Sequence, residues 1–213
     1  MNNIKAAIFD LDGTLVDSMW VWQQIDIEYL SKKGHAVPNN LNDEITHLSF
    51  TQTAEYFKKR FSLEDSIEDI MNDWNTMAYN HYKNNVNLKP GALQYLLNLK
   101  NKGIKIGLAT SNSMNLLTVT LKSNNAFELF DSITITDEVK KSKSNPDIYL
   151  LAAKKLNVDP SECMVFEDII AAARGAKLAG MKVTGVFDEH SKHQTDILKE
   201  ECDNYIYNYE DLI

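Results

Sequence analysis

The chain has 213 residues, of which 44% are hydrophobic and 24% charged, and it contains only 4 prolines and 8 glycines. This composition is that of an ordinary globular protein and excludes a collagen-like or low-complexity chain. With 30 acidic and 22 basic residues the formal net charge is −8, which argues against a protein that coats DNA or RNA, because such proteins need a basic face. The charge leaves room for one small phosphorylated ligand.

Membrane and compartment signals come next. No run of about 18 consecutive apolar residues occurs, so the sequence predicts no membrane-spanning helix. The two cysteines, Cys163 and Cys202, lie far apart, whereas a secreted disulfide scaffold would carry more of them. We therefore expect buried free thiols, a cytoplasmic location and no membrane partner.

Short apolar runs recur along the chain and predict buried strands. They are Ile4–Phe9, Ile104–Ala109, Ile133–Thr136, Met164–Phe166, Val183–Phe187 and Tyr205–Tyr207. Helical patterns separate most of these runs, at Ala92–Lys102, Pro146–Leu156 and Ala171–Leu178. In the first helix we expect Leu93, Leu96 and Leu97 on one face. Strands that alternate with helices predict βαβ units, and therefore an α/β fold with a mostly parallel sheet.

Residues 18–85 interrupt this alternation, because they show helical patterns and no strand pattern. We predict an α/β core formed by residues 1–17 and 86–213, with residues 18–85 inserted as an all-helical cap. An insertion after the first strand projects from the sheet edge at which open α/β folds bind ligands. Within the cap, Trp20, Trp22 and Trp74 are expected in its core or at its hinge, and Asp17-Ser18 is expected to cap its first helix.

The motif Asp10-Leu11-Asp12-Gly13-Thr14 ends the first predicted strand. Two carboxylates that leave a buried strand need partners, because an unpaired buried charge is costly. One interpretation is a turn and helix cap, in which Gly13 permits an unusual backbone conformation. The other interpretation is chemical: a nucleophile, an acid–base group and half of a metal site.

Three further polar signals follow in chain order near the ends of later strands. They are the run Thr110-Ser111-Asn112, the lysine Lys143 and the acidic pair Glu167-Asp168. The run offers hydroxyl and backbone donors for phosphate oxygens, although taken alone it is equally typical of a helix cap. The lysine taken alone is typical of a solvated side chain. The acidic pair repeats the pattern of the first motif and suits a hard cation with oxygen ligands.

Four strand ends in succession thus bring carboxylates, a hydroxyl, an ammonium and further carboxylates to one edge of the predicted sheet. In these four motifs and over its whole length, the chain resembles the haloacid dehalogenase-like hydrolase superfamily. It is most similar to the branch with a helical cap between the first two motifs, which contains β-phosphoglucomutase and phosphatases of small sugar phosphates or nucleotides. The resemblance implies a Rossmann-like three-layer core with a parallel sheet and an inserted all-helical cap.

The resemblance also implies a role for each motif. Asp10 would attack phosphorus and become an aspartyl-phosphate, while Asp12 would protonate the leaving oxygen and then activate water. Mg²⁺ would bind the Asp10 carboxylate, the Asp12 backbone carbonyl, Asp168 and Glu167. The transferring phosphoryl group would be held by Thr110, Ser111, Asn112 and Lys143.

The leading functional expectation is a Mg²⁺-dependent phosphatase acting on a small phosphorylated metabolite, a sugar phosphate or a nucleotide. A phosphomutase like β-phosphoglucomutase is the alternative, but the positions of that enzyme's cap histidine and cap arginine correspond here to Trp22 and a site near Phe50. A non-catalytic regulator that binds a phosphorylated metabolite is a third hypothesis, against which the intact Asp10 and Asp12 speak. We expect a monomer or weak homodimer with no nucleic-acid partner.

Overall fold

The computed structural model describes residues 4–45, 48 and 50–213. The chain forms two compact units. The core unit comprises Met1–Met19 and Val86–Ile213, and the helical unit comprises Trp20–Asn85. The role of the helical unit as a cap, with boundaries at residues 18 and 85, stays a prediction.

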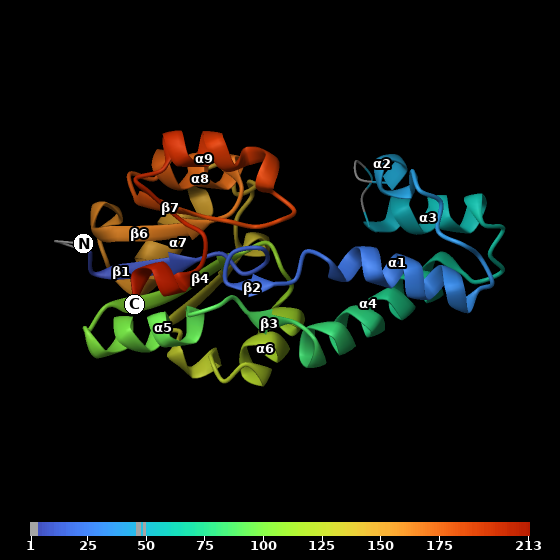
Figure 1. The fold of residues 1–213 in the computed structure, drawn as a ribbon, viewed down its shortest axis with the longest axis horizontal. Helices are drawn as coiled ribbons and strands as arrows, with labels where there is room; N and C mark the ends of the chain where they lie inside the picture. The colour runs from blue at the N-terminus through green and yellow to red at the C-terminus, as the bar shows by residue number, and fades with distance from the viewer. Residues whose placement is uncertain (1–3, 46–47, 49) are drawn as a thin grey trace. The chain divides into compact units, whose positions relative to one another are not determined.

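A six-stranded parallel sheet forms the centre of the core unit, with the strand order β5-β4-β1-β6-β7-β8 (Figure 1). The strands are β1 (Ala6–Phe9), β4 (Lys105–Thr110), β5 (Ser132–Ile135), β6 (Cys163–Glu167), β7 (Lys182–Val186) and β8 (Asn204–Ile206). All six predicted strands are present, with ends shifted by at most two residues. The predicted α/β class and parallel sheet are confirmed.

Helices cover both faces of this sheet. The core unit contains α5 (Ala92–Asn101), α6 (Met114–Ser123), α7 (Asp147–Leu156), α8 (Ile170–Leu178) and α9 (Thr195–Glu201). It also contains the 3-10 turns η1 (Phe127–Leu129), η2 (Thr136–Glu138), η3 (Pro160–Glu162), η4 (Lys192–Gln194) and η5 (Tyr209–Leu212).

Side chains alternate between the two faces along each strand. Ile8 and Val165 lie in one buried cluster with residues of α7, α8 and α9. Their neighbours Phe9 and Phe166 stack at 4.5 Å and also contact Tyr209 of η5. The three-layer architecture is therefore confirmed.

The buried face of α5 differs from the expected one. Leu93 and Leu97 are 36% and 38% exposed, while Tyr95 and Leu99 are buried. The buried stripe is centred on Tyr95, whose ring packs edge-on against Phe166 at 5.7 Å. Of the three leucines expected on one face, Leu96 is buried as expected, whereas Leu93 and Leu97 are not, because the larger aromatic surface of Tyr95 faces the sheet in their place. Helices α6 and α9 had no counterpart among the predicted elements.

A two-stranded antiparallel ribbon carries the chain out of and back into the core unit. It pairs β2 (Val16–Asp17) with β3 (Asn87–Leu88). The side chain of Asn124 holds the returning strand, since it donates to the Val86 carbonyl at 3.0 Å and accepts from the Leu88 amide at 3.1 Å. Strands of two residues are too short to show a periodicity, so no sequence pattern indicated them.

The helical unit contains α1 (Val21–Lys32), α2 (Leu41–Ile45), α3 (Phe50–Arg60) and α4 (Ile67–Asn84). No strand occurs among its described residues, as predicted. Trp74 is buried in the helical unit, where its ring centroid lies 4.9 Å from that of Phe57 and 5.8 Å from that of Tyr29. Of the two places expected for Trp22, core or hinge, the core is wrong: Trp22 is 42% exposed, because the buried stripe of α1 starts at Val21.

Both cysteines are free, as expected, but only Cys163 is buried, and Cys202 is half-buried. Within the described part of the chain, no helix combines the length and the apolar character needed to cross a membrane.

Candidate active site

The candidate site lies where the strand order of the sheet reverses. From β1 the chain adds β4 and β5 on one side and then β6, β7 and β8 on the other, so the reversal falls between β1 and β6. Open α/β sheets bind ligands at the carboxyl ends of the strands at such a point. Asp10 follows β1 directly, and its amide donates to the Phe166 carbonyl of β6 at 3.1 Å. Glu167 ends β6, and Asp168 follows it.

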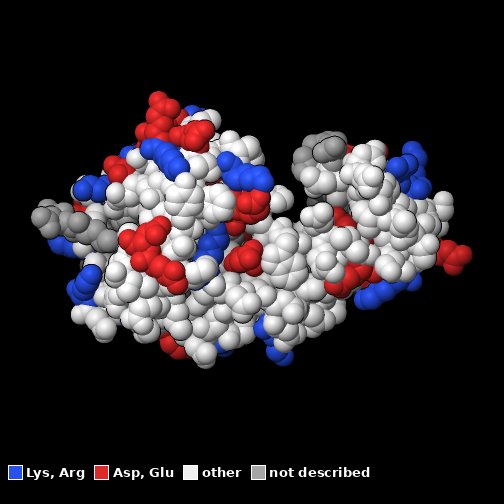
Figure 2. Space-filling model, in the orientation of Figure 1, with Lys and Arg blue, Asp and Glu red and all other residues white. Residues whose placement is uncertain are grey.

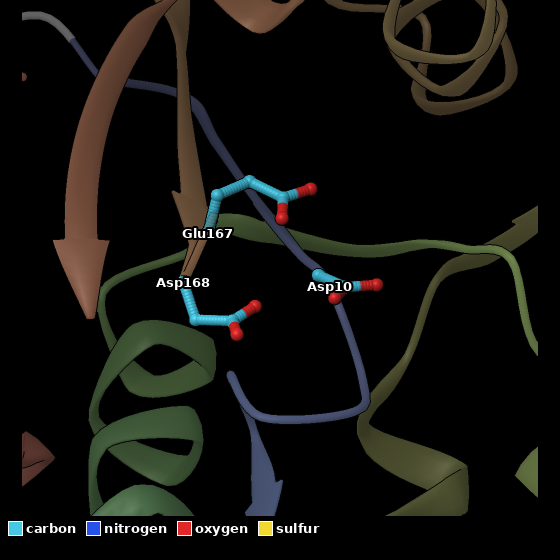
Figure 3. Close-up of side chains that lie close together, drawn as sticks. All are labelled: Asp10, Glu167 and Asp168. Carbon is cyan, nitrogen blue, oxygen red and sulfur yellow. The ribbon is translucent and has the colours of Figure 1, made fainter. Parts of the chain in front are cut away.

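Asp10, Glu167 and Asp168 form a compact cluster of carboxylates (Figure 3). One oxygen from each lies within 4.8 Å of the others, and their residues are 8%, 0% and 3% exposed. Burial is the main cause that raises the pKa of Glu167 to about 8 and that of Asp168 to about 7. Each of the three buried acids needs nearby positive charge to stay ionised, and their hard oxygen donors fit Mg²⁺.

Lys143 supplies positive charge to this cluster from the turn that precedes α7. Its Nζ lies 2.7 Å from Asp10 Oδ1 and 2.5 Å from Glu167 Oε1, and the residue is 9% exposed. Burial by itself would lower the pKa of Lys143, but the charges of Asp10 and Glu167 raise it overall. The side chain is therefore an ammonium that offsets one of the three carboxylates.

The turn that carries Lys143 packs directly against the backbone of α8. At Gly175 a Cβ atom would lie 2.0 Å from the Lys143 carbonyl oxygen and 3.0 Å from that of Asn145. Only glycine therefore lets the lysine turn approach α8 this closely. A glycine inside an otherwise alanine-rich helix was the available sequence signal for this contact.

The loop after β1 adopts a tight turn that separates Asp12 from the carboxylate cluster. The amides of Thr14, Leu15 and Val16 all donate to the Leu11 carbonyl. Gly13 has φ +74°, and a Cβ there would lie 2.6 Å from Asp168 Oδ2. Glycine is thus required at this position both for its backbone conformation and for the approach of Asp168.

The two oxygens of the Asp12 carboxylate have different partners. Oδ1 accepts from the Ser18 hydroxyl at 2.7 Å, and Oδ2 accepts from the Asn112 side-chain amide at 2.8 Å. The expectation that Ser18 caps the first helix of the insert is therefore wrong. Helix α1 begins later, at Val21, and Trp20 precedes it without a side-chain cap.

Of the predicted phosphate-binding run Thr110-Ser111-Asn112, two residues have side chains bonded within the site and one is exposed. Thr110 ends β4, is 1% exposed, and its hydroxyl oxygen accepts from the Asn112 amide at 3.0 Å. Asn112 in turn holds Asp12, whereas Ser111 is exposed. This run does not cap a helix. The N-cap of α6 is the next residue, Ser113, whose hydroxyl oxygen accepts from the Leu116 amide.

Comparison with known proteins identifies the family. Residues 7–186 match the family of haloacid dehalogenase-like hydrolases. The chain belongs to this family. The match spans the first motif, the insert and every later motif of the site, so the predicted resemblance is confirmed.

Several relatives of this haloacid dehalogenase-like hydrolase carry phosphatase names. YhcW of Bacillus subtilis, assigned as a phosphatase, is 33% identical over 84% of this chain and 81% of its own length. The phosphorylated carbohydrates phosphatase of Thermotoga maritima is 27% identical over 84% of this chain and 83% of its own length. A crystal structure assigned as a β-phosphoglucomutase of Thermotoga maritima superposes with a TM-score of 0.86 at 26% identity, covering 98% of this chain and 97% of the other. Together they support the predicted enzyme class, a phosphomonoester hydrolase of this family.

Sequence reasoning missed three polar contacts of the site. The Thr14 hydroxyl donates to Asp168 Oδ1 at 3.0 Å, and the Tyr149 hydroxyl donates to Glu167 Oε1 at 2.8 Å. Asp188 follows β7 and forms a buried ion pair with Lys89 at 3.0 Å. After burial and Asp10, the charge of Asp188 also raises the pKa of Asp168. Thr14 belongs to the first motif, but nothing marked Tyr149 or Asp188.

Charged side chains of both signs lie on the face of the molecule drawn in Figure 2. On the face drawn in Figure 2, basic and acidic side chains are interspersed over the core unit and form no continuous basic surface. A polyanion requires such a surface, whereas one small phosphorylated molecule requires positive charge only at its own site.

Proposed function

We propose that this chain is a Mg²⁺-dependent phosphatase that hydrolyses a small phosphorylated metabolite, a sugar phosphate or a nucleotide, through an aspartyl-phosphate at Asp10. The observation that carries this proposal is the placement of Asp10 at the strand-order reversal, bonded to Lys143 and clustered with Glu167 and Asp168. The phosphatase of phosphorylated carbohydrates among the relatives supports the substrate class. The proposal includes a cytoplasmic location.

Asp10 is the proposed nucleophile. One of its carboxylate oxygens forms a bond to phosphorus while the bond from phosphorus to the leaving oxygen breaks, so a difficult displacement becomes two easier ones. The attack brings a carboxylate toward a phosphate dianion, and Lys143 offsets part of the repulsion from 2.7 Å away. Thr110 at the end of β4, with Ser111 and Asn112, is proposed to hold the other phosphoryl oxygens.

Asp12 is the proposed acid and base. In the first step its protonated form donates to the leaving oxygen, and in the second step the carboxylate takes a proton from the attacking water. The bonds from Ser18 and Asn112 fix the orientation of its carboxylate. Proton transfer depends on such positioning within hydrogen-bond reach of the reacting oxygen.

Two features of the carboxylate cluster support the magnesium part of the proposal: its charges, and an oxygen without a hydrogen-bond partner among the described residues. Three buried carboxylates share the single ammonium of Lys143, and Glu167 Oε2 is buried without a hydrogen-bond partner among the described residues. Asp10, Asp168, Glu167 and the Asp12 carbonyl are the proposed ligands. A bound Mg²⁺ would supply two positive charges at the oxygens where negative charge concentrates.

A phosphomutase is the alternative that the similarity to the β-phosphoglucomutase structure favours. Against it, the two proposed cap positions hold Trp22 and Phe50, whose rings contact each other at 5.7 Å and are 42% and 39% exposed. Neither ring offers the positive charge that a second phosphate would need. Turnover of a sugar 1-phosphate that depends on added sugar bisphosphate would favour the mutase.

The test is a phosphate-release screen over sugar phosphates, nucleotides and an aryl phosphate, with Mg²⁺ and with a chelator. We expect release only with Mg²⁺, and a loss on the order of a thousandfold in Asp10→Asn with an unchanged circular dichroism spectrum. Asp137→Asn, which changes an exposed acid of the same unit, should retain full activity.

Three outcomes would contradict the proposal. Near-wild-type turnover by Asp10→Asn would remove the nucleophile assignment. Activity that survives the chelator would remove the metal assignment. No release from any phosphate ester would favour the regulator that only binds a phosphorylated metabolite.

A further inference from the structure

The two carboxylate oxygens of Glu167 are in very different surroundings. Oε1 accepts two hydrogen bonds, from Lys143 Nζ at 2.5 Å and from the Tyr149 hydroxyl at 2.8 Å. Oε2 is fully buried and has no partner among the described residues. A buried carboxylate oxygen without a partner is costly and calls for a physical explanation.

Both donors to Oε1 come from one short piece of chain. Lys143 lies in the turn before α7, and Tyr149 lies in the first turn of that helix. Tyr149 is 0% exposed and packs in the same cluster as Ile8 and Val165 of the sheet, so its ring is part of the core. The position of its hydroxyl is therefore fixed by the core.

Lys143 alone would not hold the Glu167 carboxylate in one orientation. The ammonium also bonds Asp10, and the terminal torsion of a glutamate is soft, so either oxygen could turn toward it. The Tyr149 hydroxyl removes this freedom because it reaches only the oxygen that Lys143 also bonds. Two donors on Oε1 leave Oε2 as the oxygen without a protein donor, in a carboxylate that lies beside those of Asp10 and Asp168 (Figure 3).

We propose that Tyr149 is a positioning residue for the cation site: its hydroxyl holds Glu167 Oε1 against Lys143 and thereby keeps Oε2 available to Mg²⁺, directly or through a bound water. This inference rests on the proposed magnesium site. The alternative is that Tyr149 only fills the core beneath the site, in which case its hydroxyl contributes to folding and not to cation binding.

The experiment compares Tyr149→Phe with the wild-type chain, because this change removes only the hydroxyl. Mg²⁺ binding is measured by isothermal titration calorimetry without substrate, so the readout does not depend on turnover. We expect 10- to 100-fold weaker binding, which is the usual effect of losing a group that orients a metal ligand. Circular dichroism in chelator checks that the metal-free variant is folded.

Tyr29→Phe is the matched control. Tyr29 is also buried, at 1% exposed, and its hydroxyl has no hydrogen-bond partner among the described residues. It belongs to α1 of the helical unit, so removing its hydroxyl should leave Mg²⁺ affinity unchanged. A double variant, Tyr149→Phe with Glu167→Gln, should bind no more weakly than Glu167→Gln alone, since the hydroxyl acts through Glu167.

The outcomes separate this inference from the proposed function. A wild-type chain that binds no Mg²⁺ would overturn both. Wild-type binding that is unchanged in a folded Tyr149→Phe would overturn the role of Tyr149 and leave the magnesium site standing. Should Tyr149→Phe not fold, Glu167→Gln decides: Mg²⁺ affinity equal to that of the wild type would contradict a role for Oε2.

Discussion

Gly175 gives the sharpest test of how the site is positioned. In an ordinary helix interior, replacing glycine by alanine stabilises by about 1 kcal/mol, because glycine has the larger conformational entropy to lose. Gly175 lies inside α8, so helix propensity alone predicts a more stable protein. The packing of the Lys143 turn predicts the opposite.

The size of the effect follows from the contact distance. The added Cβ would lie 2.0 Å from the Lys143 carbonyl oxygen, where real Cβ contacts do not fall below 3.0 Å. The turn and the helix must therefore separate by about 1 Å, and overpacking of this kind costs about 1–3 kcal/mol. After the gain in propensity, we expect Gly175→Ala to lose on the order of 1 kcal/mol of unfolding free energy.

We expect Gly175→Ala to reduce the rate of phosphate release more, in free-energy terms, than it reduces the free energy of unfolding. Lys143 Nζ makes its bonds to Asp10 and Glu167 at 2.7 and 2.5 Å, so a shift of about 1 Å in its backbone misplaces the ammonium. Misplacement on this scale costs about a hundredfold in rate. Phosphate release at saturating Mg²⁺ and thermal unfolding would be measured together.

Ala171→Gly supplies the control for helix propensity, since Ala171 is an exposed residue of the same helix. It should lose about 1 kcal/mol of unfolding free energy and keep its activity. A Gly175→Ala protein with wild-type activity and higher stability would refute the reasoning that this glycine makes room for Lys143.

Two further predictions concern buried charge. Lys89→Met leaves Asp188 without its cation in an ion pair whose side chains are 8% and 7% exposed. Urea unfolding should therefore show a loss of about 3–5 kcal/mol of unfolding free energy, and the double variant Lys89→Met with Asp188→Asn should recover part of it. A loss below about 1 kcal/mol in Lys89→Met would contradict this prediction. Burial raises the pKa of Asp26 to about 7, so the folded state holds its proton and stability falls as pH rises from about 4 to 7. In thermal unfolding, Asp26→Asn should therefore stabilise the protein by about 1 kcal/mol or more at pH 8 and much less at pH 4.

The part of the site that the sequence could predict is the part delivered by strand ends. Asp10 follows β1, Glu167 ends β6 and Asp168 follows it, and parallel strands bring their carboxyl ends to one edge whatever the details of packing. Chain order and apolar runs were therefore enough to place these acids together. Lys143 precedes a helix whose apolar spacing was clear, but taken alone it is typical of a solvated side chain, and its role was expected only from the resemblance to the family.

The contacts that come from helix faces and loops could not be predicted in the same way. Tyr149 looks like any core residue of α7, and only the three-dimensional packing shows that its hydroxyl reaches Glu167. Ser18 follows an aspartate before a helix, which is typical of a cap, but a carboxylate six residues earlier competes successfully for its hydroxyl. Local patterns carry no information about such competition.

The charge balance of the site explains why a net charge of −8 is compatible with an anionic substrate. The cluster holds three buried carboxyl groups and the Lys143 ammonium, which pairs with Asp10 and Glu167, so in its fully ionised form the cluster is negative and would repel a phosphate dianion. The other buried lysine at this end of the core unit, Lys89, is already paired with Asp188 and donates to the Phe187 carbonyl at 2.6 Å. The positive charge of a bound divalent cation would offset this repulsion together with Lys143, which adds a physical reason to the proposed magnesium assignment.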